Sequence, residues 1–512
     1  MATLDATMDT TLHRENPGPA GQDAAAREVE ATRGAPRAAV SPDLLRDLRA
    51  VLPDHRIITD TPSLKTFESD GLMLYRELPL VAVLPETTAQ VQEILRISHR
   101  RGVPVVPRGA GTGLSAGALP HPEGILLNLA AMDRILEVDA ANQLARVQPG
   151  VSNLSISAAA EPHGLFYAPD PSSQIICSIG GNVAENSGGV HCLKYGLTVH
   201  NLLAVKMVTI EGELITLGGD GFCTPGPDLL ALVTGSEGLL GVVVEVTVRL
   251  LPRPEATAVL LAGFASVRSA GDAVSGLIGA GILPAGLEMM DALALRAAED
   301  FADAGYPRDA EAILLCELDG LSRELDDLTA QATAVLSSHG ATSIGHARDP
   351  VERERLWKGR KCAFPAVGRI ARDYYCMDGT IPRSRIADVL EEIARLAGEY
   401  GLRVANVFHA GDGNLHPLIL FDSADADEVR RAEELGAAIL ELSVAAGGCI
   451  TGEHGVGLEK LRQMPVQFSE DELLQFEAIK AAFDEKMLLN PGKGIPILRR
   501  CQEYRALPGR DG

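Results

Sequence analysis

The sequence lacks the features that mark membrane-spanning chains and nucleic-acid-binding proteins. No stretch approaches the roughly 20 consecutive apolar residues that a helix needs to cross a bilayer. Its 46 lysines and arginines are outnumbered by 69 aspartates and glutamates, which gives a formal net charge of −23. Because such a surface repels phosphate backbones, we expect no nucleic acid partner. Because no apolar run is long enough, we also expect no transmembrane segment.

Clustered cysteines are absent as well. The eight cysteines are scattered and no two form a CxxC pair, so the sequence predicts neither a structural zinc site nor an iron–sulfur cluster of its own. The first forty residues have no apolar core of a secretory signal and contain several acids. Together these features indicate reduced thiols and predict a cytoplasmic protein.

What the sequence does contain is an α+β pattern, in which short apolar runs alternate with amphipathic helices. The length of 512 residues allows two or three domains. Residues 1–40 have no apolar period and are predicted to be a disordered leader. A boundary is predicted at Leu251-Pro-Arg-Pro254. The predicted parts are therefore a first domain at 41–255, a second at 256–459, and a C-terminal helix and tail at 460–512, in which residues 470–489 form one helix.

The first chemical signal is a glycine-rich loop that follows a predicted strand. In Pro107-Arg-Gly-Ala-Gly-Thr-Gly-Leu-Ser-Ala-Gly117, close glycines let backbone N–H groups approach a pyrophosphate. Leu114 occupies the last position of a Gly-x-Gly-x-x-Gly pattern, so a Rossmann fingerprint is excluded. A tight turn would explain one or two glycines, whereas four glycines from 109 to 117 favour a phosphate cradle.

Three further segments are rich in small and hydrogen-bonding residues: 169–189, 234–241 and 490–493. Such segments can lie flat against a planar ring and its attached chain. The candidate cofactor-binding residues are Pro107, Arg108, Gly109, Ala110, Gly111, Thr112, Gly113, Leu114, Pro169, Ser172, Ser173, Gly180, Gly181, Asn182, Asn186, Gly188, Gly189, Glu237, Gly241 and Asn490.

The second chemical signal is His409-Ala-Gly-Asp-Gly-Asn-Leu-His416, between predicted strands at 404–408 and 418–421. A hairpin turn at Asp412-Gly413 would place the two histidines directly opposite each other on one face, with Cβ atoms about 5 Å apart. A pair of packed core histidines is the alternative, but the register favours two imidazoles that share a cation.

The segment Gly452-Glu453-His454-Gly455 offers a third ligand and a base. Glu453 would complete a set of two histidines and one carboxylate for a divalent metal, with zinc, manganese and iron left undistinguished. His454 would then lie beside the metal as a general base for a hydroxyl proton. An ordinary surface loop is the alternative, which the apolar, glycine-rich setting disfavours.

In order and content, these segments resemble the FAD-binding domain of the vanillyl-alcohol oxidase/p-cresol methylhydroxylase superfamily. The resemblance implies that the 107–117 loop holds the FAD pyrophosphate, and that 169–189 and 234–241 line the isoalloxazine. It also implies that the Asn490 segment folds back onto the flavin domain. Some members attach FAD through a histidine in the glycine loop, where this chain has Thr112, so the FAD is expected to be non-covalent.

With its histidine motifs, the chain resembles one branch of that superfamily from about residue 41 to 505: metal-dependent D-2-hydroxy acid dehydrogenases with an FAD-linked oxidase C-terminal domain. Within the branch it is most similar to the FAD-carrying subunits of bacterial glycolate oxidases. Segments that carry this likeness are His191-Cys-Leu-Lys-Tyr-Gly-Leu-Thr198, Gly286-Leu-Glu-Met-Met-Asp291, Phe364-Pro-Ala-Val-Gly368 and Asp373-Tyr-Tyr-Cys-Met-Asp-Gly-Thr-Ile-Pro382.

The resemblance implies that a small D-2-hydroxy acid is oxidised to its 2-keto acid, with glycolate favoured and D-lactate as the alternative. The metal would bind the substrate hydroxyl and carboxylate, Arg360 would clamp the carboxylate, and His454 would take the hydroxyl proton while hydride passes from C2 to flavin N5. A surface arginine is the alternative for Arg360. Family members that take long dicarboxylates carry a lysine where Cys376-Met377 precede Asp378, which favours a small acid.

The resemblance also implies a second flavin-type subunit and an iron–sulfur subunit as electron acceptors, and through them a peripheral place at the inner face of the membrane. Two other classes remain open. A non-catalytic flavin electron-transfer subunit would not need His409, His416, Glu453 and His454 together. A non-redox flavin synthase would need a substrate phosphate site, for which the sequence offers no candidate.

Overall fold

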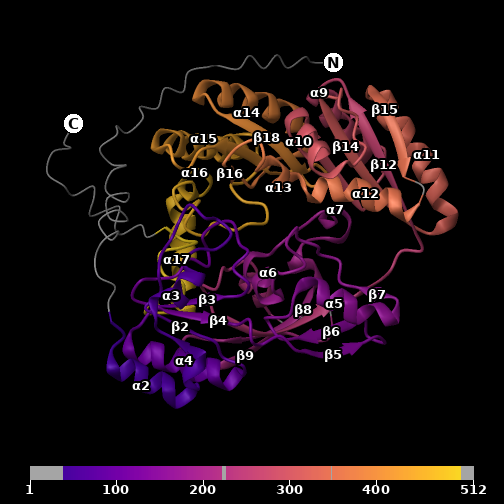
Figure 1. Ribbon diagram of the computed structural model, residues 1–512. Coiled ribbons are helices and arrows are strands. Elements are labelled where there is room, and N and C mark those ends of the chain that lie inside the picture. Colours follow the sequence, from indigo (N-terminus) through magenta and orange to yellow (C-terminus); the bar gives the residue numbers. More distant parts are fainter. Residues whose placement is uncertain (1–38, 222–225, 348, 497–512) are drawn as a thin grey trace. The chain divides into compact units, whose positions relative to one another are not determined.

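The computed structural model describes residues 39–221, 226–347 and 349–496 (Figure 1). The predicted leader at 1–40 lies outside the described residues except for its last two, and so does the tail from 497 onward. The helices and strands belong to one unit that begins at Val40. None of the helices in the described ranges has both the length and the apolar character that a crossing of the bilayer requires.

The first sheet has the strand order β1-β2-β4-β3. Strands β2 (Val81–Val83), β4 (Ile125–Asn128) and β3 (Val105–Arg108) run parallel, while β1 (Ile57–Ile58) is antiparallel to β2. Helix α4 (Thr88–Arg101) leads from β2 to β3 and begins with a capping box at Thr87. The glycine loop therefore leaves the end of a buried parallel strand, as the sequence predicts.

The second sheet is antiparallel, in the order β5-β6-β10-β8-β9. Buried and partly exposed residues alternate in the first half of β10, and helix α6 (Ile179–Glu185) packs against that strand. The bounds are β5 (Ile135–Asp139), β6 (Leu144–Val147), β8 (Leu202–Val208), β9 (Leu214–Gly218) and β10 (Val242–Arg249), with α5 (Asn153–Ala160) following β6.

The third sheet of the described residues has nine strands and is antiparallel. Its central order is β15 (Ala341–Ala347), β12 (Ala256–Phe264), β14 (Ala312–Gly320), β13 (Gly286–Asp291), β18 (Arg403–His409), β19 (Asn414–Leu415) and β17 (Gly379–Thr380). Strand β20 (Pro417–Phe421) pairs with both β18 and β16 (Asp373–Cys376).

Alternate residues along this sheet enter two separate apolar cores, because successive side chains of a strand point to opposite faces. One core takes Leu314 and Cys316 of β14 together with helices α9 (Val267–Gly279), α11 (Ser322–Ser338), α14 (Ile386–Tyr400) and α15 (Ala426–Ala445). The other takes Ile313 and Leu315 with helices α10 (Ala292–Ala302), α12 (Pro350–Lys361) and α13 (Ala363–Val367). Helices thus cover both faces (Figure 1), and the predicted α+β class is confirmed.

The C-terminal helix is shorter than the predicted run of 470–489, because α17 spans Glu470–Phe483. The Asp484 carboxylate accepts hydrogen bonds from Lys480 Nζ (2.6 Å) and from the backbone N–H of Leu489 (2.7 Å), which turns the chain out of the helix. Leu489 then forms a parallel bridge with Val105 of β3. The segment after the helix consequently lies beside the strand that carries the glycine loop.

Candidate active site

A cavity of about 660 Å3 lies where the first two sheets meet residues of the third. One end is lined by the loop after β3, by the start of α6 and by residues 236–243. The other end is lined by Phe364, His416, Glu453 and His454, together with Lys361 at the end of α12. The glycine-rich segments and the histidine motifs, separate in the sequence, therefore face one space.

Most of the predicted cofactor-binding residues line this cavity: Pro107, Arg108, Gly109, Ala110, Gly111, Thr112, Gly113, Leu114, Ser172, Ser173, Gly180, Gly181, Asn182, Glu237 and Gly241. Five others do not: Pro169, Asn186, Gly188, Gly189 and Asn490. Glu185, at the end of α6, lines the cavity with a buried carboxylate oxygen that has no hydrogen-bond partner among the described residues, and the sequence analysis did not single it out.

The glycine loop presents its backbone to the cavity. Within the described residues, the backbone N–H groups of residues 109–114 donate no hydrogen bond, so they are available to an anionic group. Gly111 has φ +71°, and a Cβ atom there would lie 2.2 Å from Arg108 Nη2. These features fit the pyrophosphate of a bound FAD, whose site needs unpaired donors and a backbone free of side chains.

Arg108, which is among the residues that line the cavity, braces this loop. Its guanidinium donates hydrogen bonds to the carbonyls of Ser69 (2.8 Å), Phe67 (3.4 Å) and Ala118 (3.3 Å), and the residue is buried. Three carbonyl acceptors fix the guanidinium plane, so the turn above it keeps one shape.

Asn490 lies behind the cavity and connects two of its walls. Its Nδ2 donates to the carbonyls of Gly117 (3.0 Å) and Glu237 (2.8 Å). Lys493 donates from Nζ to Gly117 O (3.1 Å) and Asn490 Oδ1 (2.8 Å), and burial lowers the pKa of Lys493 to about 7. The predicted return of this segment to the glycine loop thus takes the form of direct hydrogen bonds.

The two histidines of the second motif are diagonal neighbours, not direct partners as the hairpin prediction required. His409 is paired with Asn414, and Asn406 is paired with Pro417. The register therefore differs by two residues from the predicted one, and an even shift keeps both side chains on the same face of the sheet. Their rings are T-shaped, with centroids 5.1 Å apart.

His409, His416 and Glu453 bring one ligand atom each to within 4.8 Å of one another. Glu453 Oε1 lies 3.0 Å from His416 Nε2 and 3.3 Å from His409 Nε2, and both histidines are almost completely buried. Burial alone would lower the histidine pKa values, but contacts with Glu288 and Glu453 raise the pKa of His409, and contacts with Cys376 and Glu453 raise the pKa of His416 to about 10. Two imidazoles and one carboxylate that converge in this way are chemically suited to a divalent cation, which would replace the shared protons.

Each of these histidines is oriented through its other ring nitrogen. His409 Nδ1 lies 2.6 Å from Glu288 Oε1, and His416 Nδ1 lies 3.3 Å from the carbonyl oxygen of Met377. Such partners fix the tautomer and ring orientation of metal-ligating histidines. Glu288 was missed by the sequence analysis, although a lone acid inside the apolar run of β13 signals a buried charge that must be paired.

The structure places Arg360 differently from its predicted role as a carboxylate clamp. Arg360 is only 3% exposed, and its Nε and Nη2 lie 2.7 Å and 2.6 Å from Glu288 Oε2. It does not line the cavity, whereas the next residue, Lys361, does. The buried Glu288 carboxylate holds the guanidinium because an unpaired charge at this depth would be costly, so Arg360 positions Glu288 and through it His409.

A second buried acid, Asp378, holds the loop that carries Glu453 and His454. Its Oδ2 accepts hydrogen bonds from Thr451 Oγ1 (2.7 Å) and the backbone N–H of His454 (2.9 Å), and Lys460 Nζ lies 2.9 Å away. Burial would raise the pKa of Asp378, but the neighbouring His454 and Lys460 side chains hold that pKa below its usual range. Apart from the Asp378-Gly379 pair, no feature of the sequence indicated this role.

His454 lines the cavity beside His416. Its ring is stacked on that of His416, with centroids 5.1 Å apart and planes at 10°. Burial lowers the pKa of His454 to about 4, and its Nδ1 has no hydrogen-bond partner among the described residues. The lowered pKa keeps the imidazole neutral, which is the form in which a histidine can act as a base.

Two family models match the sequence: the FAD binding domain over residues 79–218, and the C-terminal domain of FAD linked oxidases over 253–494. The glycolate oxidase subunit GlcD of Escherichia coli K12 is 60% identical over 91% of this chain and 93% of its own length. The GlcD subunit of Bacillus subtilis is 39% identical over 83% of this chain and 91% of its own length. D-lactate dehydrogenase of Anaerostipes hadrus is 31% identical over 89% of this chain and 97% of its own length.

Solved structures share the fold at lower identity. Substrate-bound p-cresol methylhydroxylase superposes with a TM-score of 0.75 at 16% identity, over 90% of this chain and 98% of that chain. The 4-ethylphenol oxidase of Gulosibacter chungangensis gives a TM-score of 0.76 at 16% identity, over 91% and 100% of the two chains. At this identity the likeness establishes the fold alone.

Proposed function

Because the chain belongs to the family of FAD-linked oxidases, we propose that it oxidises a small D-2-hydroxy acid, glycolate above others, to the 2-keto acid with non-covalent FAD as the electron acceptor. The observation that carries the proposal is the single cavity whose one end is a backbone anion cradle and whose other end holds His416, Glu453 and His454. A non-catalytic electron-transfer subunit would have no use for the second end.

When bound, FAD supplies a two-electron acceptor, and a divalent cation held by His409, His416 and Glu453 supplies a Lewis acid that polarises a hydroxyl. Zinc, manganese and iron all suit this set of ligands. The residues of the chain do the rest. His454, neutral and lining the cavity, takes the hydroxyl proton. Asp378 holds the backbone of His454 in place.

The substrate carboxylate needs a cationic partner, and we propose Lys361 in place of Arg360. Lys361 lines the cavity near Phe364, while the guanidinium of Arg360 is engaged by Glu288. A lysine ammonium binds a carboxylate as a point charge and tolerates small differences in substrate position.

Glycolate is favoured over D-lactate because the relatives with the highest identities quoted above are glycolate oxidase subunits, whereas the D-lactate dehydrogenase is 31% identical. The two acids differ by one methyl group, which a pocket distinguishes only weakly. D-lactate therefore stays the alternative substrate.

The same relatives are named as subunits, so we propose that electrons leave the flavin through partner chains: a second flavin-type subunit and an iron–sulfur subunit. The proposed place is the cytoplasm, or the inner face of the membrane through these partners. We also propose the division into a flavin domain at 41–255, a second domain at 256–459 and a C-terminal part at 460–512.

The direct test is anaerobic bleaching of the bound flavin by glycolate, D-lactate, L-lactate and D-2-hydroxyglutarate, before and after chelation. We expect rapid bleaching by glycolate that is lost with the chelator. His454→Ala should retain FAD but reduce flavin about 10²- to 10⁴-fold more slowly, because the base is absent. Absence of bleaching by all four acids in the FAD-loaded chain would favour the electron-transfer class, and full-rate reduction in His454→Ala would refute the role of that residue.

A further inference from the structure

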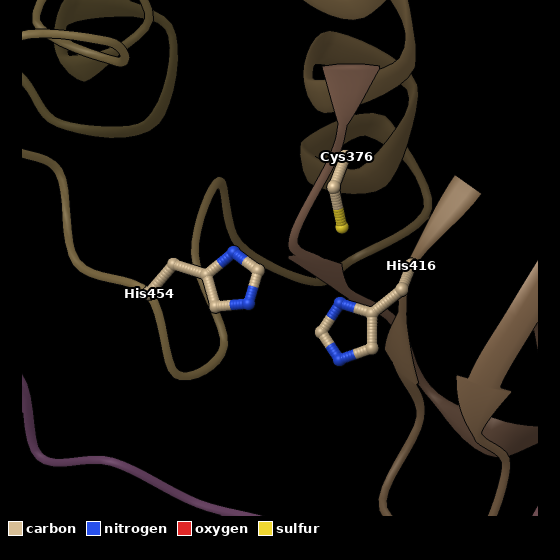
Figure 2. Close-up of side chains that lie close together, drawn as sticks. All are labelled: Cys376, His416 and His454. Carbon is tan, nitrogen blue, oxygen red and sulfur yellow. The ribbon is translucent and has the colours of Figure 1, made fainter. Parts of the chain in front are cut away.

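A second set of metal-ligating side chains adjoins the first. Cys376 Sγ and ring nitrogens of His416 and His454 lie within 4.8 Å of one another. Figure 2 shows the three side chains facing a common space, with Cys376 at the end of β16, His416 before β20 and His454 in the loop held by Asp378. One thiol and two imidazoles differ in chemical character from the set of two imidazoles and one carboxylate.

The two sets share His416 but use opposite sides of its ring. Its Nε2 lies 3.0 Å from Glu453 Oε1, in the first set. Its Nδ1 lies on the side of the β16 end, 3.3 Å from the Met377 carbonyl and toward Cys376 (Figure 2). His454 Nδ1, in the same set as Cys376, is buried and has no hydrogen-bond partner among the described residues.

We propose that Cys376, His416 and His454 form a binding site for a soft, thiophilic divalent cation such as Cd2+ or Zn2+, and that this site excludes a cation from the His409–His416–Glu453 set. Thiolate and imidazole ligands together select soft and borderline cations, whereas a carboxylate in place of the thiolate admits harder ones such as Mn2+. Binding replaces the thiol proton, which is released to solvent, so no oxidant or other reactant is involved.

Exclusion follows from the single proton of a neutral imidazole. With a cation on Nε2, that proton sits on Nδ1 and faces Met377 O, as expected for a histidine ligand with a carbonyl partner. With a cation on Nδ1, the proton sits on Nε2 and faces Glu453 Oε1. Occupying both nitrogens at once requires an imidazolate, so one cation at a time is favoured.

A cation in the second site would also bind His454 and so remove the proposed base. This consequence for turnover rests on the proposed function, while the binding and the exclusion do not. Soft metals would therefore inhibit the protein by binding at a buried cysteine, Cys376, and not at an exposed one.

The binding test uses the full-length, FAD-loaded chain and Cd2+ alone, without substrate. Cd2+ is expected to produce the ultraviolet charge-transfer band of a cadmium thiolate at one equivalent. Cys376→Ser should lose the band. Cys449→Ser is the matched control and should keep it, because Cys449 lies in neither set and its partners, Thr380 Oγ1 (2.5 Å) and Thr451 O (3.2 Å), suit a hydroxyl.

A band that persists in Cys376→Ser, is lost in Cys449→Ser, or is missing from the wild-type chain would overturn the site. FAD content of each variant reports whether it has folded. Exclusion is tested on the wild-type chain, where Mn2+ at ten times its own dissociation constant should weaken the apparent affinity for Cd2+ about tenfold. An affinity for Cd2+ that Mn2+ leaves unchanged would overturn the exclusion.

The two proposals fail separately. A chain that shows the cadmium band but no flavin bleaching with any hydroxy acid would keep the second site and lose the proposed function. A chain that is bleached by glycolate but shows no band would keep the function and lose the site.

Discussion

The two ends of the cavity are built on different principles. At the flavin end, the chain offers backbone N–H groups of residues 109–114 that have no partner in the described structure, and the side chain of Arg108 braces the loop. At the histidine end, buried acidic side chains do most of the positioning. There Glu288 orients His409, and Asp378 orients the loop of Glu453 and His454.

This difference determines what each end tolerates. A site made of backbone depends on shape, so substitutions act there through added atoms and forced φ angles. A site made of buried charges depends on pairing, so removal of one partner leaves another charge unpaired and costs more than the lost contact itself. The flavin end should therefore fail in binding, and the histidine end in chemistry.

The largest expected effect is at Glu453, the carboxylate shared by both histidines. Glu453→Gln should slow flavin reduction by glycolate about a thousandfold, because loss of Lewis-acid polarisation is worth several kcal/mol. FAD should remain bound, since the amide oxygen can still accept from Gly188 N–H. Stopped-flow reduction measures this, with the exposed Glu441→Gln as control; equal rates in the two variants would contradict the role.

A smaller effect distinguishes the roles of the neighbouring basic residues Arg360 and Lys361. Arg360→Lys should weaken cation affinity about 10- to 100-fold, because the paired geometry that orients Glu288 and His409 is lost, while KM for glycolate at saturating cation changes little. Lys361→Met should instead raise KM and leave cation affinity unchanged. Metal titration and steady-state kinetics on both variants measure the split, and the reverse pattern would restore Arg360 as the substrate clamp.

At the flavin end, Gly111→Ala should weaken FAD binding about tenfold, because alanine at φ +71° is strained by about 1–2 kcal/mol and its Cβ meets Arg108. Once it is saturated with FAD, this variant should still be reduced at nearly the wild-type rate. Gly219→Ala, where a Cβ meets no atom within 4 Å, is the control. A variant that binds FAD normally but is no longer reduced would contradict the expectation that substitutions at the flavin end impair FAD binding and not the chemistry.

The smallest effect concerns His191, whose ring lies between the carboxylates of Asp170 and Glu317. Its Nδ1 lies 2.8 Å from Asp170 and its Nε2 lies 3.2 Å from Glu317. Burial opposes the charge, but these carboxylates raise the pKa of His191 well above its ordinary value of about 6.5. A raised folded-state pKa means that the contribution to stability is complete below about pH 6.5 and is lost as pH rises through the folded-state pKa.

His191→Gln should therefore lower stability by about 1–2 kcal/mol at pH 6, and the difference from wild type should shrink as pH rises. Thermal unfolding at a series of pH values measures it, with the exposed His163→Gln as control. A difference that grows with pH would show that the pairing is not charge-assisted.

Local pattern was enough to predict much of this molecule. The strands predicted at 404–408 and 418–421 lie within β18 and β20, because continuous apolar runs define them. The resemblance to the glycolate oxidase branch is confirmed by relatives of up to 60% identity. The predicted end of α17 was wrong because the Asp484 side chain turns the chain out of the helix after Phe483.

Long-range pairing was the part that pattern could not supply. The hairpin register at His409 was wrong by two residues, since the turn spans Ala410 to Gly413 and the Asp-Gly pair is not at its centre. The resemblance implied a substrate role for Arg360, but the partner that the structure gives it, Glu288, is 72 residues away in the sequence.

By itself, the sequence determined where the glycine-rich backbone and the candidate cation ligands lie along the chain, because glycine spacing and ligand type are local properties. Only the tertiary structure decided which charges pair. Glu288 with Arg360, Asp378 with the 451–454 loop, and Cys376 with His416 and His454 are brought together across the fold, where burial makes each charge depend on its neighbour.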